Sequence, residues 1–142
     1  MGTIRAVCTS ETKGIQKSER ERVELRPDWG IGDDAHAGAW HRQVSLLAYE
    51  KVADFKARGA DVDNGAFGEN LVVEGIDLSN LPLGTRLRSG EVELELTQIG
   101  KECHARCAIY HQMGDCIMPR EGVFCRVITG GTLAPGDPLD VI

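Results

Sequence analysis

The residues from Val92 to Ile99 alternate apolar and polar side chains more cleanly than any other part of this 142-residue chain. One face of the stretch would carry a valine and two leucines, and the other face two glutamates and a threonine. This period of two predicts a β-strand that is buried on one side. Residues 85–88 precede it across Ser89-Gly90, which predicts a hairpin. We interpret the two glutamates as a solvated face and not as an acid/base pair.

Other short apolar stretches predict further strands, and one amphipathic stretch predicts a helix. The main helix is expected over about residues 45–58, where apolar side chains recur at helical spacing before Gly59. Residues 76–82 predict one short helical turn, and 123–129 fit either a helical turn or a strand. Six to eight short strands with one main helix predict a mostly β fold, as a barrel or sandwich. The remaining strands are expected at 3–8, 23–25 and 138–142.

The composition predicts a single domain over residues 1–142. The sequence shows neither an apolar run of the ~20 residues that a membrane span needs nor a signal-peptide layout at its start. Five cysteines, an odd number, favour reduced thiols, so we expect a cytoplasmic protein. A formal net charge of −6 argues against nucleic acid as a partner.

Residues 28–43 form the longest stretch without any period, and they combine two histidines, two tryptophans and three aspartates. A long aromatic loop in a compact domain is often functional. His36, His41 and Arg42 would then reach an anion or a metal. In the alternative interpretation, the tryptophans cover an edge of the core and the histidines bond to the backbone. For Cys8, near the first strand, we expect a small buried thiol.

The stretch 98–110 follows the clearest strand and places two cysteines and a histidine between a lysine and an arginine. Residues 99–126 contain four Lys/Arg against three acids, in a chain that is acidic overall. A neighbouring cation lowers the pKa of a thiol from about 8.5 and so favours the reactive thiolate. This pattern indicates a small anionic or soft-metal ligand.

Cys103 and Cys107 are four residues apart, which is unsuitable for a mutual disulfide on either a helix or a strand. Three readings remain open from the residues alone. A helical spacing would permit a structural zinc site completed by His104 or Cys116, although the pattern is not a standard zinc motif. A single thiolate near Lys101, Arg106 and Arg120 would carry a persulfide or ligate molybdenum. Both cysteines would otherwise be buried in a barrel.

The sequence resembles the MOSC family, named for the C-terminal domain of molybdenum cofactor sulfurase, and most of all its small stand-alone bacterial members. The family has a closed, strand-rich β-barrel, so the resemblance implies that fold for residues 1–142 and a role in molybdenum cofactor binding or sulfur transfer. The blocks that carry the resemblance are SETKG (10–14), GDDAHAG (32–38), WHRQVSLL (40–47), GAFGEN (65–70), IDLSNLPLGTRLR (76–88), TQIGKECHARCAIY (97–110) and GDCIMPREGVF (114–124).

By its Arg-Cys-apolar context, Cys107 matches the family's characteristic cysteine, which the resemblance implies is a molybdenum ligand or a persulfide carrier. Cys103 is the second candidate, and His104 or His111 would assist a catalytic thiolate. The cations would hold the phosphate of the pterin cofactor or lower the thiol pKa. The pocket would be edged by Lys13, His36, His41, Arg42, Lys101, Arg106 and Arg120.

Three functional hypotheses follow. The leading one is a molybdenum-cofactor-binding or sulfur-carrier domain. The second is a stand-alone sulfur transferase or a molybdenum-dependent reductase component, and the third is a structural metal-binding domain. By comparison with the larger eukaryotic relatives, we expect neither their separate N-terminal β-barrel domain nor a pyridoxal-phosphate desulfurase domain within these 142 residues, so we expect the protein to need a sulfur donor, an acceptor or a partner enzyme.

Overall fold

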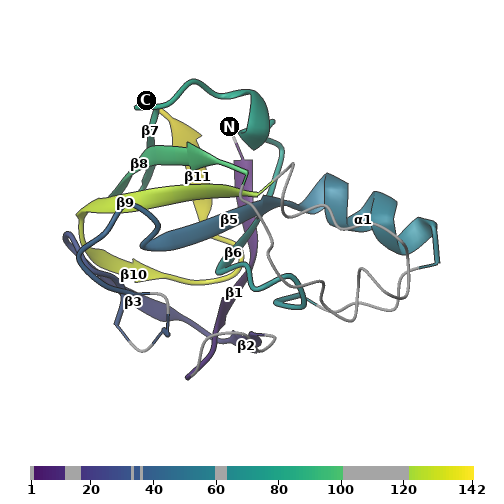
Figure 1. The fold of residues 1–142 in the computed structure, drawn as a ribbon, viewed down its shortest axis with the longest axis horizontal. Helices are drawn as coiled ribbons and strands as arrows, with labels where there is room; N and C mark the ends of the chain where they lie inside the picture. Colours follow the sequence, from purple (N-terminus) through teal and green to yellow (C-terminus); the bar gives the residue numbers. More distant parts are fainter. Residues whose placement is uncertain (1, 12–16, 33, 36, 60–63, 101–121) are drawn as a thin grey trace.

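The computed structural model describes residues 2–11, 17–32, 34, 35, 37–59, 64–100 and 122–142. In that part of the chain, eleven strands, one α-helix and one 3-10 turn follow one another (Figure 1). In chain order these elements are β1 (Gly2–Thr9), β2 (Ser18–Arg20), β3 (Val23–Arg26), β4 (Gly30–Ile31), β5 (Val44–Ala48), α1 (Tyr49–Ala57), β6 (Leu71–Glu74), η1 (Leu78–Asn80), β7 (Arg86–Ser89), β8 (Val92–Ile99), β9 (Val123–Thr129), β10 (Gly131–Leu133) and β11 (Pro138–Val141).

Seven strands close into a barrel. They pair in the order β11-β7-β8-β9-β5-β6-β1, and β11 pairs with β1 to complete the ring. β2 continues the sheet outside the ring by pairing with the end of β1. A second sheet of three strands, β10-β3-β4, packs below the barrel in the view of Figure 1. The predicted closed, strand-rich barrel is therefore confirmed.

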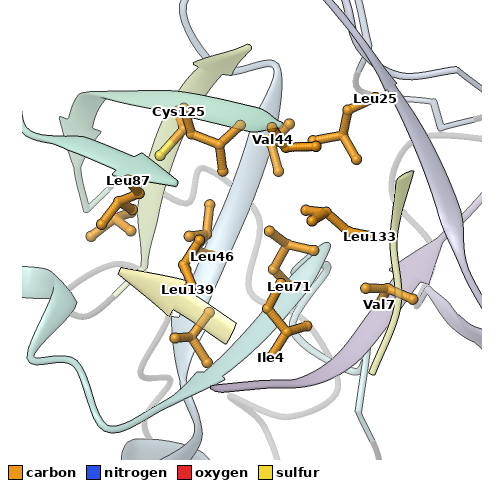
Figure 2. Close-up of a cluster of buried hydrophobic side chains, with 14 of the residues drawn as sticks. Ile4, Val7, Leu25, Val44, Leu46, Leu71, Leu87, Cys125, Leu133 and Leu139 are labelled. Atoms are coloured by element: carbon orange, nitrogen blue, oxygen red, sulfur yellow. The ribbon is translucent and has the colours of Figure 1, made fainter. Parts of the chain in front are cut away.

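The hydrophobic core lies inside the barrel and extends to the second sheet. Figure 2 shows Leu25 and Leu133, from the second sheet, pointing toward Val7, Val44 and the other labelled barrel residues. These side chains are almost completely buried. β8 has the alternation that the sequence predicts, with buried residues at every second position from Val92 to Leu96. The two sheets therefore share one core.

α1 connects β5 to β6, which are parallel neighbours in the ring. Parallel strands need such a crossover, since a tight turn joins only antiparallel neighbours. The helix projects to the right of the barrel in Figure 1. Its first residue, Tyr49, packs on a small cluster formed by Ala6, Cys8 and Val72 on the outer face of β1 and β6. Cys8 is fully buried there, as the sequence predicted.

The helix expected over about residues 45–58 begins at Tyr49, so the prediction of its start was wrong. Residues Val44–Ala48 form strand β5, which lies in the middle of the ring. All five of its residues are buried. A strand that is buried on both faces shows no period of two, so its apolar side chains extended the helical pattern of the residues that follow.

The number of strands also exceeds the expected six to eight, because β2, β4 and β10 are each only two or three residues long. β4 lies inside the stretch 28–43 that the sequence suggested was irregular throughout. Residues 123–129, left open between helix and strand, form β9. The hairpin of β7 and β8 and the turn near 76–82 are confirmed. Among the described residues, no helix is long and apolar enough to cross a membrane.

Candidate functional site

Residues 101–121, which include Cys103 and Cys107, follow β8 and precede β9 in the sequence. The amide of Gly100 donates to the carbonyl oxygen of Gly122 at 2.6 Å, so the two residues that flank this segment meet at one point of the barrel rim. Gly100 has a φ of 72°, in the left-handed region that favours glycine. Gly100, which directly follows the strand predicted most clearly from the sequence, therefore ends β8.

Eight of the ten predicted site residues lie outside the described residues, and two can be placed. Those two, His41 and Arg42, lie next to the Gly100–Gly122 pair. Nε2 of His41 is 2.7 Å from Oε1 of Gln98, and Nε2 of Gln98 donates to the carbonyl oxygen of Gly100 at 2.7 Å. The eight outside are Lys13, His36, Lys101, Cys103, His104, Arg106, Cys107 and Arg120.

Thr97 fixes the backbone at this point. Its hydroxyl reaches the carbonyl oxygen of His41 and, at 3.1 Å, that of Phe124 in β9. The predicted loop residue His41 is therefore bound to β8 through both its ring and its backbone. The ring of His41 bonds to a side chain, whereas His36, the other histidine of this stretch, lies outside the described residues.

Arg42 lies between two aromatic rings. Its guanidinium carbon is 4.6 Å from the ring centroid of Trp40 and 5.6 Å from that of Phe124. Its Nε is buried and has no hydrogen-bond partner within the described part of the chain. A buried donor without a partner is costly, so this side chain is suited to an anionic or carbonyl-bearing ligand.

The two described cysteines are unsuitable as reactive thiols. The pKa of the Cys8 thiol is raised to about 12, chiefly by burial; the nearby carboxylates of Glu69 and Glu19 contribute to this rise, and the charge of Lys17 opposes it. Burial, with Glu95 nearby, also raises the pKa of Cys125 well above its ordinary value. The thiolate is the nucleophilic form, so both side chains are inert structural thiols.

A buried ion pair between Lys17 and Asp34 also contacts Ser10, so it connects the SETKG and GDDAHAG blocks. Nζ of Lys17 is 2.6 Å from Oδ1 of Asp34, and both side chains have 0% exposure. The same nitrogen donates to Oγ of Ser10 at 3.2 Å, while the amide of Ser10 donates to Asp34. The ends of two loops far apart in the sequence are thus held by one charged cluster.

The GAFGEN block packs against this cluster. The carboxylate of Glu69 is fully buried and accepts hydrogen bonds from the amides of Gly65 and Phe67, both at 3.1 Å. Burial raises its pKa to about 7, although these amides and Lys17 lower it. The amide of Lys17 donates to the carbonyl oxygen of Gly65 at 2.9 Å. Glu69 therefore stabilises the loop around Gly65, and the backbone of Lys17 is hydrogen-bonded to that loop.

Asn70, the last residue of the block, connects three strands. Its Oδ1 accepts from the amide and hydroxyl of Ser45, and its Nδ2 donates to the carbonyl oxygen of Cys8 at 3.0 Å. Sequence reasoning did not single out Lys17, Asp34, Glu69 or Asn70 as site residues. The available signal was that Asp34, Glu69 and Asn70 stand in glycine-bearing blocks without any apolar period; Lys17 stands in a polar stretch outside these blocks.

Comparison with known proteins agrees with this architecture. The model of the MOSC domain matches residues 33–140. The solved structure of the YuaD protein from Bacillus subtilis is similar over 99% of this chain and 96% of its own, at 18% identity and a TM-score of 0.76. YiiM from Geobacillus stearothermophilus is similar over 100% of this chain and 75% of its own, at 22% identity and a TM-score of 0.75.

YiiM from Escherichia coli is similar over 99% of this chain and 69% of its own, at 19% identity and a TM-score of 0.67. At these identities the solved structures show a common fold and nothing further. No curated protein matches the chain. Since the family model covers well over half of the residues, the chain belongs to the MOSC domain family, a family linked to molybdenum cofactor binding and sulfurase-type function.

Proposed function

We propose that this protein is a molybdenum-cofactor-binding or sulfur-carrier domain whose working group is the thiolate of Cys107, with Cys103 as the second candidate. The observation that carries the proposal is the rim of the barrel where residues 101–121 begin and end. There His41 and Arg42, both predicted from the sequence, lie beside the Gly100–Gly122 pair. The inert state of Cys8 and Cys125 leaves the three cysteines of that segment as the candidates.

The described rim fits an anionic, flat cofactor better than a bare cation. Arg42 offers a buried Nε without a partner and stacks on Trp40 and Phe124. Among the residues that the structure describes, no group of three His, Cys, Asp or Glu side chains gathers as a metal site. Arg42 would therefore contact the phosphate or pterin of the cofactor, and His41 would add a donor. When bound, molybdenum cofactor supplies redox or sulfur-transfer chemistry at the metal.

The carrier function requires only the protein's own thiolate and an external sulfur donor. The Cys107 thiolate would attack the outer sulfur of a donor persulfide, forming the new S–S bond while the donor sulfur leaves as a thiolate. Nearby cations favour this step, because they stabilise the attacking thiolate. The reverse attack by an acceptor thiolate would return Cys107 to its starting state, with no net oxidation of the protein.

The test is to purify the protein without oxygen from a host that makes molybdenum cofactor, and to measure its intact mass and molybdenum content. We expect either molybdenum with a pterin or a reducible gain of one sulfur, about 32 Da for a persulfide. Cys107→Ser should remove this loading without unfolding the barrel. Cys8→Ala is the matched control, because that thiol is buried under α1 and should not carry the load.

Equal loading of wild-type protein and Cys107→Ser would contradict the assignment of Cys107, and Cys103→Ser should then be the variant that loses it. If neither variant changes the load, the thiolate proposal is wrong. Sulfur transfer by the isolated domain, measured with a donor persulfide and a small acceptor thiol, would separate an enzyme from a carrier.

A further inference from the structure

A polar cleft of about 240 Å³ lies between the end of β1, the turn from β2 to β3 and the residues after β4. Its floor is formed by the buried side chains of Val23 and Ile31. Its walls carry three arginines and a single carboxylate, in a chain with a net charge of −6. The described residues that line it are Thr9, Arg20, Arg22, Val23, Glu24, Arg26, Ile31 and Gly32.

Strand geometry explains why three guanidinium groups meet there. On β2, neighbouring side chains point to opposite sides. Arg20 accordingly lines the cleft, and Nη1 donates to Oγ1 of the buried Thr9 at 3.2 Å. Glu19, its neighbour, bonds instead to Asn64 at 3.3 Å. Glu19 therefore does not neutralise the cleft, and Glu21, the acid on the other side of Arg20 in sequence, is not among the described lining residues.

On β3 the same alternation buries Val23 and Leu25 and exposes Arg26. Nε of Arg26 is 3.4 Å from Oε1 of Glu24, through an ion pair whose side chains are 62% and 68% exposed. Exposed pairs of this kind contribute little, so Glu24 does not fix the guanidinium. A Cβ at Gly32 would stand 3.4 Å from that Nε, so the guanidinium lies against bare backbone.

Only one of the three arginines has a carboxylate partner among the residues that the structure describes. Arg20 bonds to a neutral hydroxyl, and Arg22 forms no ion pair within that part of the chain. Three guanidinium groups around a small cleft thus share one carboxylate. Guanidinium forks match phosphate and sulfate oxygens in bidentate geometry.

We propose that this arginine cleft, formed by Arg20, Arg22, Arg26 and Thr9, binds a phosphate-type oxyanion. A dianion with four oxygens can face several guanidinium groups at once, whereas a carboxylate offers only two oxygens. The volume is below the ~300–1,000 Å³ of sites that enclose drug-sized ligands, which favours a free anion or the phosphate end of a larger molecule. The described lining of the cleft comes from residues 9–32, so this proposal rests on the arginines and not on the thiolate.

The test is isothermal titration of the purified wild-type protein with inorganic phosphate at constant ionic strength. We expect saturable binding with a Kd in the millimolar range, since the arginines are exposed to solvent. The affinity should fall as potassium chloride is raised. Sulfate should compete, and acetate should bind at least tenfold more weakly.

The double variant Arg22→Gln/Arg26→Gln should weaken phosphate binding at least tenfold. Both side chains are exposed, so the variant should fold, which circular dichroism would check. If the double variant does not fold, Arg22→Gln alone should still weaken binding about threefold. Lys56→Gln is the matched control, because it removes one charge from the exposed face of α1, away from β3.

Equal phosphate affinity in wild-type protein and the arginine variants, or acetate binding as tight as phosphate binding, would overturn the proposal. A comparison with glycerol 2-phosphate identifies the source of the anion. Tighter binding of this ester by tenfold or more assigns the cleft to the phosphate end of a larger ligand, and equal binding assigns it to the free anion.

Discussion

Replacement of Lys17 by methionine should destabilise the protein far more than the loss of an ordinary ion pair. The side chain of Lys17 has no exposed surface, and its nitrogen contacts Asp34 and Ser10. Methionine fills a similar volume but removes the charge and the donors. The variant would remove the charge that opposes the buried carboxylate of Asp34, while the hydrogen bond from the amide of Ser10 to that carboxylate would remain.

The size of the effect follows from burial. Removing one partner of a buried ion pair costs about 3–5 kcal/mol, because the other charge stays desolvated. For a domain of this size, a cost of about 3 kcal/mol lowers Tm by roughly 10 °C. The Arg5–Glu74 pair offers a contrast, since its side chains are 45% and 43% exposed. Glu74→Gln should cost about 1 kcal/mol or less.

The assay is urea denaturation followed by circular dichroism, applied to wild-type protein, Lys17→Met, Asp34→Asn and the double variant. We expect the double variant to be less destabilised than the sum of the single variants by about 1–3 kcal/mol, as for residues in direct contact. Additive effects, or a loss below about 1 kcal/mol in Lys17→Met, would refute the view that the pair is a buried, mutually dependent element.

Three further predictions concern Glu69, Gly65 and Arg42. Glu69 has a folded pKa of about 7 against an ordinary 4.5, so the folded state keeps a proton that the unfolded chain releases between these values. Stability should therefore fall by about 3 kcal/mol as pH rises from 4.5 to 7. Glu69→Gln should flatten this slope in thermal melts across that range, and an unchanged slope would exclude Glu69 as its source. Gly65→Ala should lower Tm more than Gly136→Ala does. Both glycines have positive φ, but of the two only an added Cβ at Gly65 would clash with backbone, at 2.1 Å from the carbonyl oxygen of Lys17. Equal effects of the two substitutions in calorimetry would contradict this. Arg42→Met should reduce molybdenum or sulfur loading at least tenfold, and the loading of Arg42→Lys should lie between those of Arg42→Met and the wild-type protein. If metal and mass analysis found full loading of Arg42→Met, Arg42 would not belong to the site.

The fold was predictable where one face of a strand is buried and the other is not. β8 and its hairpin with β7 were predicted from alternation alone, because that pattern records a one-sided core. β5 lost the signal because all five of its residues are buried, and β9 lost it because its first three residues are buried in succession. β2 gave none, because all three of its side chains are exposed and only its pairing with β1 makes it a strand.

The site was predictable only in part. The sequence indicated His41 and Arg42 through an aromatic, irregular loop, and both lie at the rim where the cysteine segment joins the barrel. Lys17, Asp34 and Glu69 were missed for a physical reason. Charged residues are almost always exposed, so a sequence without its fold gives no sign that Lys17 and Asp34, 17 positions apart, meet in the interior.

The most direct measurement is the rate at which each of the five cysteines is alkylated in the native protein, resolved by peptide mass spectrometry over a range of pH. We predict that Cys107, with Cys103 next, reacts first and with an apparent pKa below the ordinary value of about 8.5. Cys8 and Cys125 should react only after denaturation, because burial raises the pKa of both. A native protein in which Cys107 reacts no faster than Cys8, or titrates above the ordinary thiol pKa, would contradict a thiolate function at this rim.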